Sequence, residues 1–139
     1  MSLLKSLVNL LPSQIVYAHC DIPCGIYDPH GAQLAAKTVL TMVQKINALG
    51  TESVEDRNNF VRMVTVKEQY AELCKREILI LWTDYFKAEH LEKHPDLHEL
   101  VWKATKLCSE NKRNVDEQKA QELVEAVDKI AEVFADTKK

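Results

Sequence analysis

The sequence predicts an all-α protein, an antiparallel four-helix bundle with a metal-binding hook loop before its first helix. The chain has 139 residues, which suits one domain with a substantial core. Only three glycines and four prolines occur in it, whereas Ala, Leu, Val, Lys and Glu are abundant. This composition favours helices over a turn-rich β fold. Four segments repeat apolar residues every three or four positions, and the short connections between them favour antiparallel packing.

The first predicted helix follows Asp28-Pro29, and Gly50 closes it because glycine commonly ends a helix. Its apolar stripe consists of Leu34, Ala35, Val39, Leu40, Val43, Ile46 and Leu49. The second predicted helix spans about 53–86, a stretch that contains neither proline nor glycine. Its stripe consists of Val61, Val64, Tyr70, Cys74, Ile78, Leu81, Trp82 and Tyr85. We predict one long helix there.

Pro95 predicts the first position of a third helix, because its fixed φ suits a first turn. The inward positions of this helix are Leu97, Leu100, Val101, Ala104, Leu107 and Cys108. Residues 111–115 are expected to form a linking turn, and Asp116 to cap the last helix. The last stripe consists of Ala120, Leu123, Val124, Val127, Ile130, Ala131 and Phe134. Lys138 and Lys139 are expected to fray.

The charges argue against two classes of partner. The 18 Lys and Arg residues are balanced by 21 Asp and Glu residues, so we expect neither nucleic acid nor a membrane surface as a partner. The four cysteines do not form the dense framework of a small secreted domain, which favours reduced thiols in the cytoplasm. Cys74 and Cys108 fall on apolar stripes and are expected to be buried structural thiols.

Residues 1–18 form a separate N-terminal segment that is rich in leucine, with Lys5 as the only charge. A secretory signal is one interpretation, but Pro12 interrupts the apolar run and the residues before position 19 make a poor cleavage site for that pathway. An amphipathic helix packed on the bundle is a second interpretation. A removable cytosolic leader that ends at Ala18 is the third.

Residues 19–29 read His-Cys-Asp-Ile-Pro-Cys-Gly-Ile-Tyr-Asp-Pro. The thiols of Cys20 and Cys24, together with the adjacent His19, can converge on one soft or borderline metal. A tetrahedral zinc site would need a fourth ligand, for which His30 is the remaining candidate close in sequence. Backbone nitrogens could instead complete a square-planar site for nickel(II) or copper(II). The spacing itself does not choose among these metals.

This hook resembles the nickel hook of nickel-dependent superoxide dismutases. Three later segments resemble family segments in the same order: Lys67-Glu68-Gln69 with Ala71-Glu72-Leu73, Leu81-Trp82-Thr83-Asp84-Tyr85-Phe86-Lys87, and Glu92-Lys93-His94-Pro95-Asp96-Leu97-His98. The likeness covers about residues 19–139 and implies one domain over that range, with its hook at 19–29. It also implies that residues 1–18 are a leader, which a peptidase removes between Ala18 and His19.

The resemblance assigns one nickel ion to each subunit and draws its ligands from three residues. These ligands are the new amine and the imidazole of His19, the backbone nitrogen and thiolate of Cys20, and the thiolate of Cys24. The imidazole binds when the metal is oxidised. Anionic sulfur and a deprotonated amide are strong donors, so they bring the Ni(III)/Ni(II) couple within reach of superoxide.

Four further residues are expected to shape the site. Tyr27 would lie over the open face of the metal and order water or peroxide through its hydroxyl, with a packing role on the bundle as the alternative. Tyr85 is a weaker candidate for the same pocket, because considered alone such a residue is more often a core residue of its helix. Asp21 would accept backbone hydrogen bonds that fix the turn, and Pro23 would set its shape.

Two positions depart from the family pattern. In family members a glutamate on the first helix and an arginine on the second can brace the axial imidazole. Here the corresponding positions are Ala35 and Tyr70. Since such partners orient and tune a ligand, the partner of the His19 imidazole is in question.

We therefore expect a nickel superoxide dismutase that converts superoxide to dioxygen and hydrogen peroxide. The resemblance further implies a homo-hexamer in the cytoplasm. Two other functions fit the residues: a non-catalytic interaction bundle that carries zinc or free thiols, and a nickel-delivery protein. A separate metal site at His90, His94 and His98 is disfavoured, because Pro95 interrupts the helical face that they would share.

Overall fold

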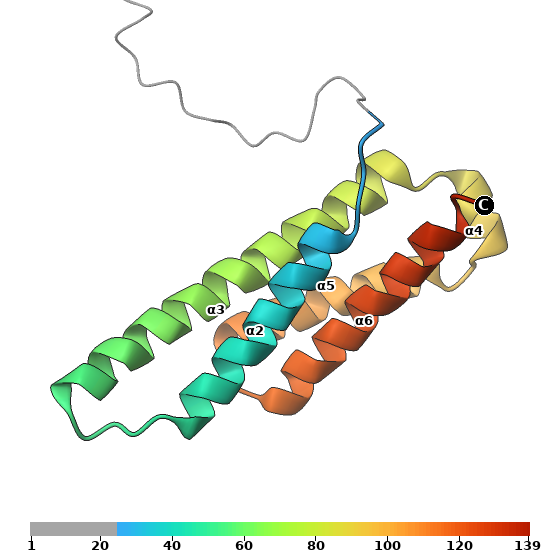
Figure 1. The fold of residues 1–139 in the computed structure, drawn as a ribbon. Helices are drawn as coiled ribbons and strands as arrows, with labels where there is room; N and C mark the ends of the chain where they lie inside the picture. Colours follow the sequence, from blue (N-terminus) through green and yellow to red (C-terminus); the bar gives the residue numbers. More distant parts are fainter. Residues whose placement is uncertain (1–24) are drawn as a thin grey trace, which may run out of the picture.

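Four long helices form an antiparallel bundle in the computed structural model, which describes residues 25–139 (Figure 1). These helices are α2 (His30–Ala48), α3 (Val54–Ile80), α5 (Leu97–Arg113) and α6 (Glu117–Asp136). α2 packs against α3 and α6, and α5 packs against the same two helices, which closes the bundle. The predicted all-α bundle is confirmed.

Polar caps at the helix starts explain where two of these helices begin. The Ser53 hydroxyl accepts a hydrogen bond from the Asp56 backbone N–H at 2.9 Å, and the Asp56 carboxylate accepts one in return. Asp116 caps α6 as predicted, because its carboxylate accepts from the Lys119 N–H at 3.1 Å. The predicted start at Pro95 is wrong by two residues, since α5 begins at Leu97.

The second predicted helix does not continue unchanged to Phe86. The α-helix ends at Ile80, and a π-helical turn, η1 (Leu81–Tyr85), follows it. The Phe86 N–H donates to the Leu81 carbonyl at 2.9 Å, five residues back, which defines the wider turn. A short helix, α4 (Ala88–Lys93), then leads into α5 and was not predicted.

The core contains most of the predicted stripe residues, including Cys74 and Cys108, which are both fully buried. The Cys74 thiol donates to the Ala32 carbonyl at 3.5 Å. A hydrogen bond with the neighbouring Cys108 thiol, together with burial, raises the pKa of Cys74 above its usual range. Cys74 is therefore a neutral thiol, and both cysteines are buried in the bundle, as predicted.

Two predicted core positions are exposed instead. Leu34 is 56% exposed because the buried line of α2 runs through Ala35 and Val39, and each step along a helix turns about 100°. Val61 is 62% exposed and precedes Lys67, the first buried residue of α3.

Segments from both ends of the described chain meet at one end of the bundle. In Figure 1 the blue segment before α2 lies at the same end of the bundle as the yellow C-terminal end of α3 and the red C-terminal end of α6. Gly25 and Tyr27 thus lie at the same cavity as Thr137 and Lys138. Within residues 25–139, no helix combines the length and apolar character needed to cross a membrane.

Candidate functional site

The predicted hook residues His19, Cys20, Asp21, Pro23 and Cys24 lie outside the residues that the structure describes. The described chain starts at the next residue. The described part of the predicted site therefore consists of the segment that follows Cys24 and the bundle surface that this segment contacts.

Tyr27 is positioned by the first turn of α2. The Asp28 carboxylate accepts a hydrogen bond from the His30 backbone N–H at 2.7 Å. The Pro29 carbonyl accepts from the Gln33 N–H at 3.0 Å, which continues the helix back to the proline. These bonds fix the direction in which the chain enters α2, and with it the position of the preceding tyrosine.

Tyr85 meets Tyr27 at this end of the bundle. Their ring centroids lie 5.6 Å apart, with the ring planes inclined at 52°. Tyr85 also packs on Phe134 of α6, with a centroid separation of 4.5 Å, and stacks on His90 of α4 at 5.6 Å. Aromatic contacts from three other segments therefore hold the Tyr85 ring in place.

The direction of the Tyr85 hydroxyl proton follows from its neighbour. The hydroxyl oxygens of Tyr85 and Thr137 lie 2.6 Å apart, and the Thr137 hydroxyl donates to the Phe134 carbonyl at 2.6 Å. A threonine hydroxyl has a single proton, so Thr137 must accept from Tyr85. Tyr85 thus donates to Thr137, and its phenol oxygen can only accept from any further group.

A cavity of about 500 Å³ lies against these side chains. Its lining residues are Gly25, Tyr27, Asp84, Tyr85, Lys87, His90, Thr137 and Lys138. The two lysines outnumber the one carboxylate, which gives the cavity an excess of positive charge. The His90 Nδ1 accepts from the Lys87 backbone N–H at 3.1 Å, so a neutral His90 ring carries its proton on Nε2.

The chain also matches known proteins along almost its whole length. The family model described as nickel-containing superoxide dismutase matches residues 14–138. This chain belongs to that family. Nickel superoxide dismutases of Streptomyces seoulensis and Streptomyces coelicolor are 39% and 38% identical to it over 128 residues. Those alignments span 92% of this chain and 94% of each relative.

Solved structures of nickel superoxide dismutases agree with the fold. The native structure of one such enzyme, 38% identical in sequence, matches with a TM-score of 0.77 over 87% of this chain and 100% of that one. A structure with nickel ligation corresponding to the oxidised state matches with the same TM-score. The helical bundle of this nickel-containing superoxide dismutase family member is thus the bundle of its solved relatives.

Sequence reasoning placed Tyr27 and Tyr85 in one pocket of this superoxide dismutase fold, and the structure brings the two together. It missed His90, Thr137 and Lys138. Lys138 was expected to fray, but with Thr137 it forms a turn after α6 that lines the cavity. Phe134, four residues before Lys138, was the available signal, because residues at this spacing share a helical face.

Ala35 and Tyr70, the two positions that depart from the family pattern, place no charged side chain in the structure. Ala35 is fully buried in α2, and Tyr70 is half-buried in α3 and packs against the core. A methyl group cannot brace an imidazole through a hydrogen bond, and a phenol could do so only as a neutral partner. Tuning by a charged brace from these positions is therefore absent from this superoxide dismutase.

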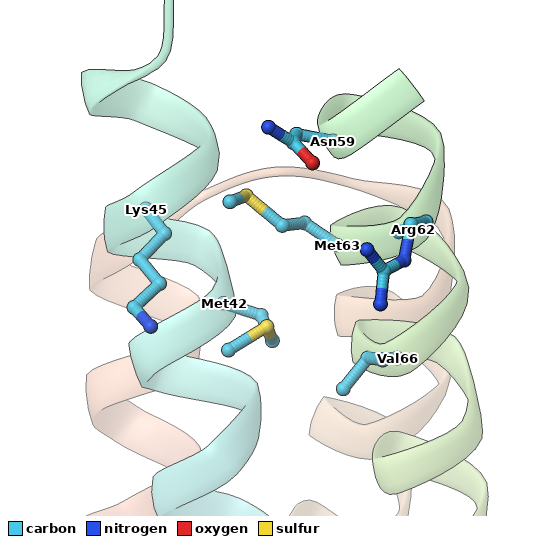
Figure 2. Close-up of a pocket in the computed structure, with 6 residues that line it drawn as sticks. All are labelled: Met42, Lys45, Asn59, Arg62, Met63 and Val66. Carbon is cyan, nitrogen blue, oxygen red and sulfur yellow. The ribbon is translucent and has the colours of Figure 1, made fainter. Parts of the chain in front are cut away.

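A second hollow of about 260 Å³ lies between α2 and α3, toward the opposite end of the bundle (Figure 2). Figure 2 shows Met42 and Lys45 on one helix facing Asn59, Arg62, Met63 and Val66 on the other. Met42 lies 12 residues into α2, or about 18 Å along its axis from His30. This hollow is therefore remote from the end where the hook joins the bundle.

The three spaced histidines occupy different surroundings. His90 stacks on Tyr85, the His94 Nε2 lies 3.2 Å from an Asp136 carboxylate oxygen, and the His98 ring lies 5.6 Å from the Trp82 ring. Within residues 25–139, no group of three or more His, Cys, Asp or Glu side chains converges to hold a metal ion.

Proposed function

We propose that this chain, once residues 1–18 are removed, catalyses the disproportionation of two superoxide ions and two protons to dioxygen and hydrogen peroxide. One observation carries the proposal: Tyr27, three residues after Cys24, lines a cavity together with Tyr85. The chain that contains this cavity belongs to the nickel-containing superoxide dismutase family. Three residues of chain span at most about 11 Å, so whatever Cys24 binds is confined to this end of the bundle.

The donor set of the hook fits nickel. His19, Cys20 and Cys24 would hold the ion through nitrogen and thiolate donors, which suit square-planar nickel(II) and include no carboxylate. Nickel, when bound, supplies a one-electron couple between Ni(II) and Ni(III). Removal of residues 1–18 matters because it creates the free amine of His19, which an uncut chain lacks. Asp21 and Pro23 would keep the hook in its turned shape.

The described residues would control access and protons. The rings of Tyr27 and Tyr85 line the cavity that a small anion would enter on its way to the hook. The Tyr85 hydroxyl donates to Thr137, so it could accept a hydrogen bond from water or from hydrogen peroxide. Tyr27 would order water at the cavity mouth.

Three features of the setting complete the proposal. A leader-cleaving peptidase would act between Ala18 and His19. The reaction would take place in the cytoplasm, where the hook thiols remain reduced until nickel binds. The assembled enzyme would be a homo-hexamer.

The test is metal selection by a chain that begins at His19. We would offer equal nickel and zinc to this trimmed chain and to the full chain, measure bound metal by elemental analysis, and follow superoxide decay after pulse radiolysis. We expect about one nickel per trimmed chain, with dismutase activity, and no nickel in the full chain. A Cys24→Ser variant of the trimmed chain serves as the matched control and should bind no redox-active nickel.

Three outcomes would contradict the proposal. Zinc in both forms, or no metal in either, would favour a zinc- or thiol-bearing interaction bundle. Nickel that leaves readily to a chelator, without dismutase activity, would favour a nickel-delivery protein. Full activity in a trimmed chain extended by one residue before His19 would show that the free amine is dispensable.

A further inference from the structure

We propose that Met42 and Met63 form an oxidation site for hydrogen peroxide, at which each thioether takes up one oxygen atom and becomes a sulfoxide. The site is the hollow between α2 and α3, toward the end of the bundle opposite Tyr27 and Tyr85. Hydrogen peroxide is a product of the proposed function, and the inference rests on that function only for the source of the oxidant.

The distribution of methionine in the sequence singles out this hollow. The chain has three methionines, and Met1 belongs to the segment that precedes His19. Once residues 1–18 are removed, Met42 and Met63 are therefore the only methionines, and the two line one hollow although they come from different helices. Any sulfoxide that forms in the trimmed chain must form there.

Both thioethers are open to a small reagent. Met42 and Met63 are half-buried, and Figure 2 shows them extending from their two helices into the same hollow. Methionine reacts with peroxide where its sulfur can be reached. By contrast, Cys74 and Cys108 are fully buried in the core, and a neutral, buried thiol is inert.

The charged neighbours of the two thioethers favour this reaction. Lys45, three residues after Met42, and Arg62, directly before Met63, are exposed and line the hollow with them. None of the described residues that line it is a carboxylate. The same cations disfavour a metal ion as the ligand of these sulfurs, so the hollow suits a neutral reagent whose reaction develops negative charge.

The reaction needs no further reagent. A sulfur lone pair attacks one oxygen of hydrogen peroxide, so that an S–O bond forms while the O–O bond breaks. The departing hydroxide takes the proton from the oxygen that is now bound to sulfur, which gives one sulfoxide and one water. Sulfur is oxidised by two electrons and the peroxide is reduced by two. Cations beside the hydroxide stabilise the charge that it gains as it leaves.

Two double variants separate the position of these cations from the net charge of the protein. Lys45→Gln with Arg62→Gln removes both cations from the hollow. Lys37→Gln with Arg76→Gln is the matched control, because it removes one lysine from α2 and one arginine from α3 at exposed positions that do not line the hollow. Thermal unfolding would establish that both double variants are folded.

The test exposes the nickel-loaded chain that begins at His19, and both double variants, to a fixed excess of hydrogen peroxide. Free N-acetylmethionine amide in the same solution supplies the intrinsic rate of a solvated thioether. The two methionines fall on separate tryptic peptides, 38–45 and 63–67 in the parent, so mass spectrometry gives the rate of sulfoxide formation at each. They also stay on separate peptides in both double variants, because Arg57 is retained.

We expect both methionines of the parent to be oxidised within about twofold of the free amide or faster. Removing Lys45 and Arg62 should slow their oxidation about two- to fivefold at low ionic strength, whereas the control pair should keep the parent rate. Equal rates in the two double variants would overturn the role of the cations. Oxidation more than about tenfold slower than that of the free amide would overturn the site itself, since the hollow would then be covered. Because peroxide is added, a chain without dismutase activity gives the same readout, so failure of the proposed function is distinguished from failure of this inference.

Discussion

Two tyrosines share one cavity but differ in what holds them. Tyr85 is surrounded by aromatic rings and donates its hydroxyl proton to Thr137, so both its ring and its proton are fixed. Tyr27 is held through the backbone of the first turn of α2 and contacts the Tyr85 ring. The position of Tyr27 therefore depends on how the chain enters α2, whereas the position of Tyr85 depends on the packed core.

This difference predicts separate effects of removing each hydroxyl. Tyr27→Phe should keep nickel and stability but lower kcat about three- to tenfold and change inhibition by hydrogen peroxide, a smaller loss than the hundredfold expected when a direct proton donor is removed. Steady-state and pulse-radiolysis kinetics of the trimmed, nickel-loaded enzyme would measure this. Tyr85→Phe is the comparison, because it also removes the hydrogen bond to Thr137 and should lower the thermal midpoint. Kinetics and peroxide inhibition equal to the parent's would show that the Tyr27 hydroxyl has no gating role.

At the scale of the element, the end of α5 depends on a lysine from another helix. Lys67 of α3 is only 1% exposed, and its ammonium group donates to the backbone carbonyls of Asn111 and Lys112, the latter at 3.0 Å. These carbonyls belong to the last turn of α5, where a helix has unpaired acceptors and a partial negative charge. Burial lowers the pKa of Lys67, and the negative charge of Glu68 opposes that shift. The two carbonyls supply hydrogen-bond acceptors for the ammonium group in the core.

Lys67→Met should therefore destabilise the bundle although it adds apolar surface. We expect a loss of about 2–4 kcal/mol, because the substitution leaves buried carbonyls without a donor. Lys75→Met is the matched control on the same helix: the Lys75 ammonium group donates to the Ser109 hydroxyl at 3.0 Å in a partly buried position. Its loss should stay near 1 kcal/mol. Urea unfolding of both variants gives the values, and an equal cost would contradict a special role for Lys67 at the end of α5.

Periodic patterns predicted the long helices because each buries one stripe, and Asp116 was predicted as the cap of α6. The cap at Ser53 was not predicted. Gly25, the first described residue, has a φ of 71°, which lies in the left-handed region that glycine favours. The π-helical turn and α4 could not be predicted, because no proline or glycine marks the change at Ile80. The burial of Lys67 was also hidden, since its partners are backbone carbonyls whose position depends on the fold.

At the scale of the whole molecule, the site gathers segments that are far apart in the sequence. Tyr27, Tyr85 and Thr137 come together because α2 begins, α3 ends and α6 ends at the same end of the bundle. The resemblance to the family predicted Tyr27 and Tyr85 as residues of one pocket, and antiparallel packing explains why they meet. The spacing of Phe134 and Lys138 indicates only a shared helical face, so the contacts of the C-terminal turn with Tyr85 required the structure.

The exposed apolar side chains of the single chain are relevant to the proposed homo-hexamer. Large apolar side chains are exposed on several helices: Leu34, Val54, Phe60, Val61, Leu73, Leu79 and Trp102. Single exposed residues of this kind are common, but their number along α3 gives copies of the chain an apolar surface to share. We proposed a homo-hexamer, in which such surface would be covered.

Sedimentation velocity of the trimmed chain with nickel should therefore give a species of six chain masses at micromolar concentration. Because association stabilises the folded state by mass action, the thermal midpoint should rise with protein concentration. A dilution series provides the control, since a monomer keeps both its sedimentation coefficient and its midpoint. A concentration-independent monomer with full dismutase activity would contradict the hexamer while leaving the hook chemistry intact. Activity lost on dilution together with the assembly would show that the site at this end of the bundle is completed by neighbouring copies.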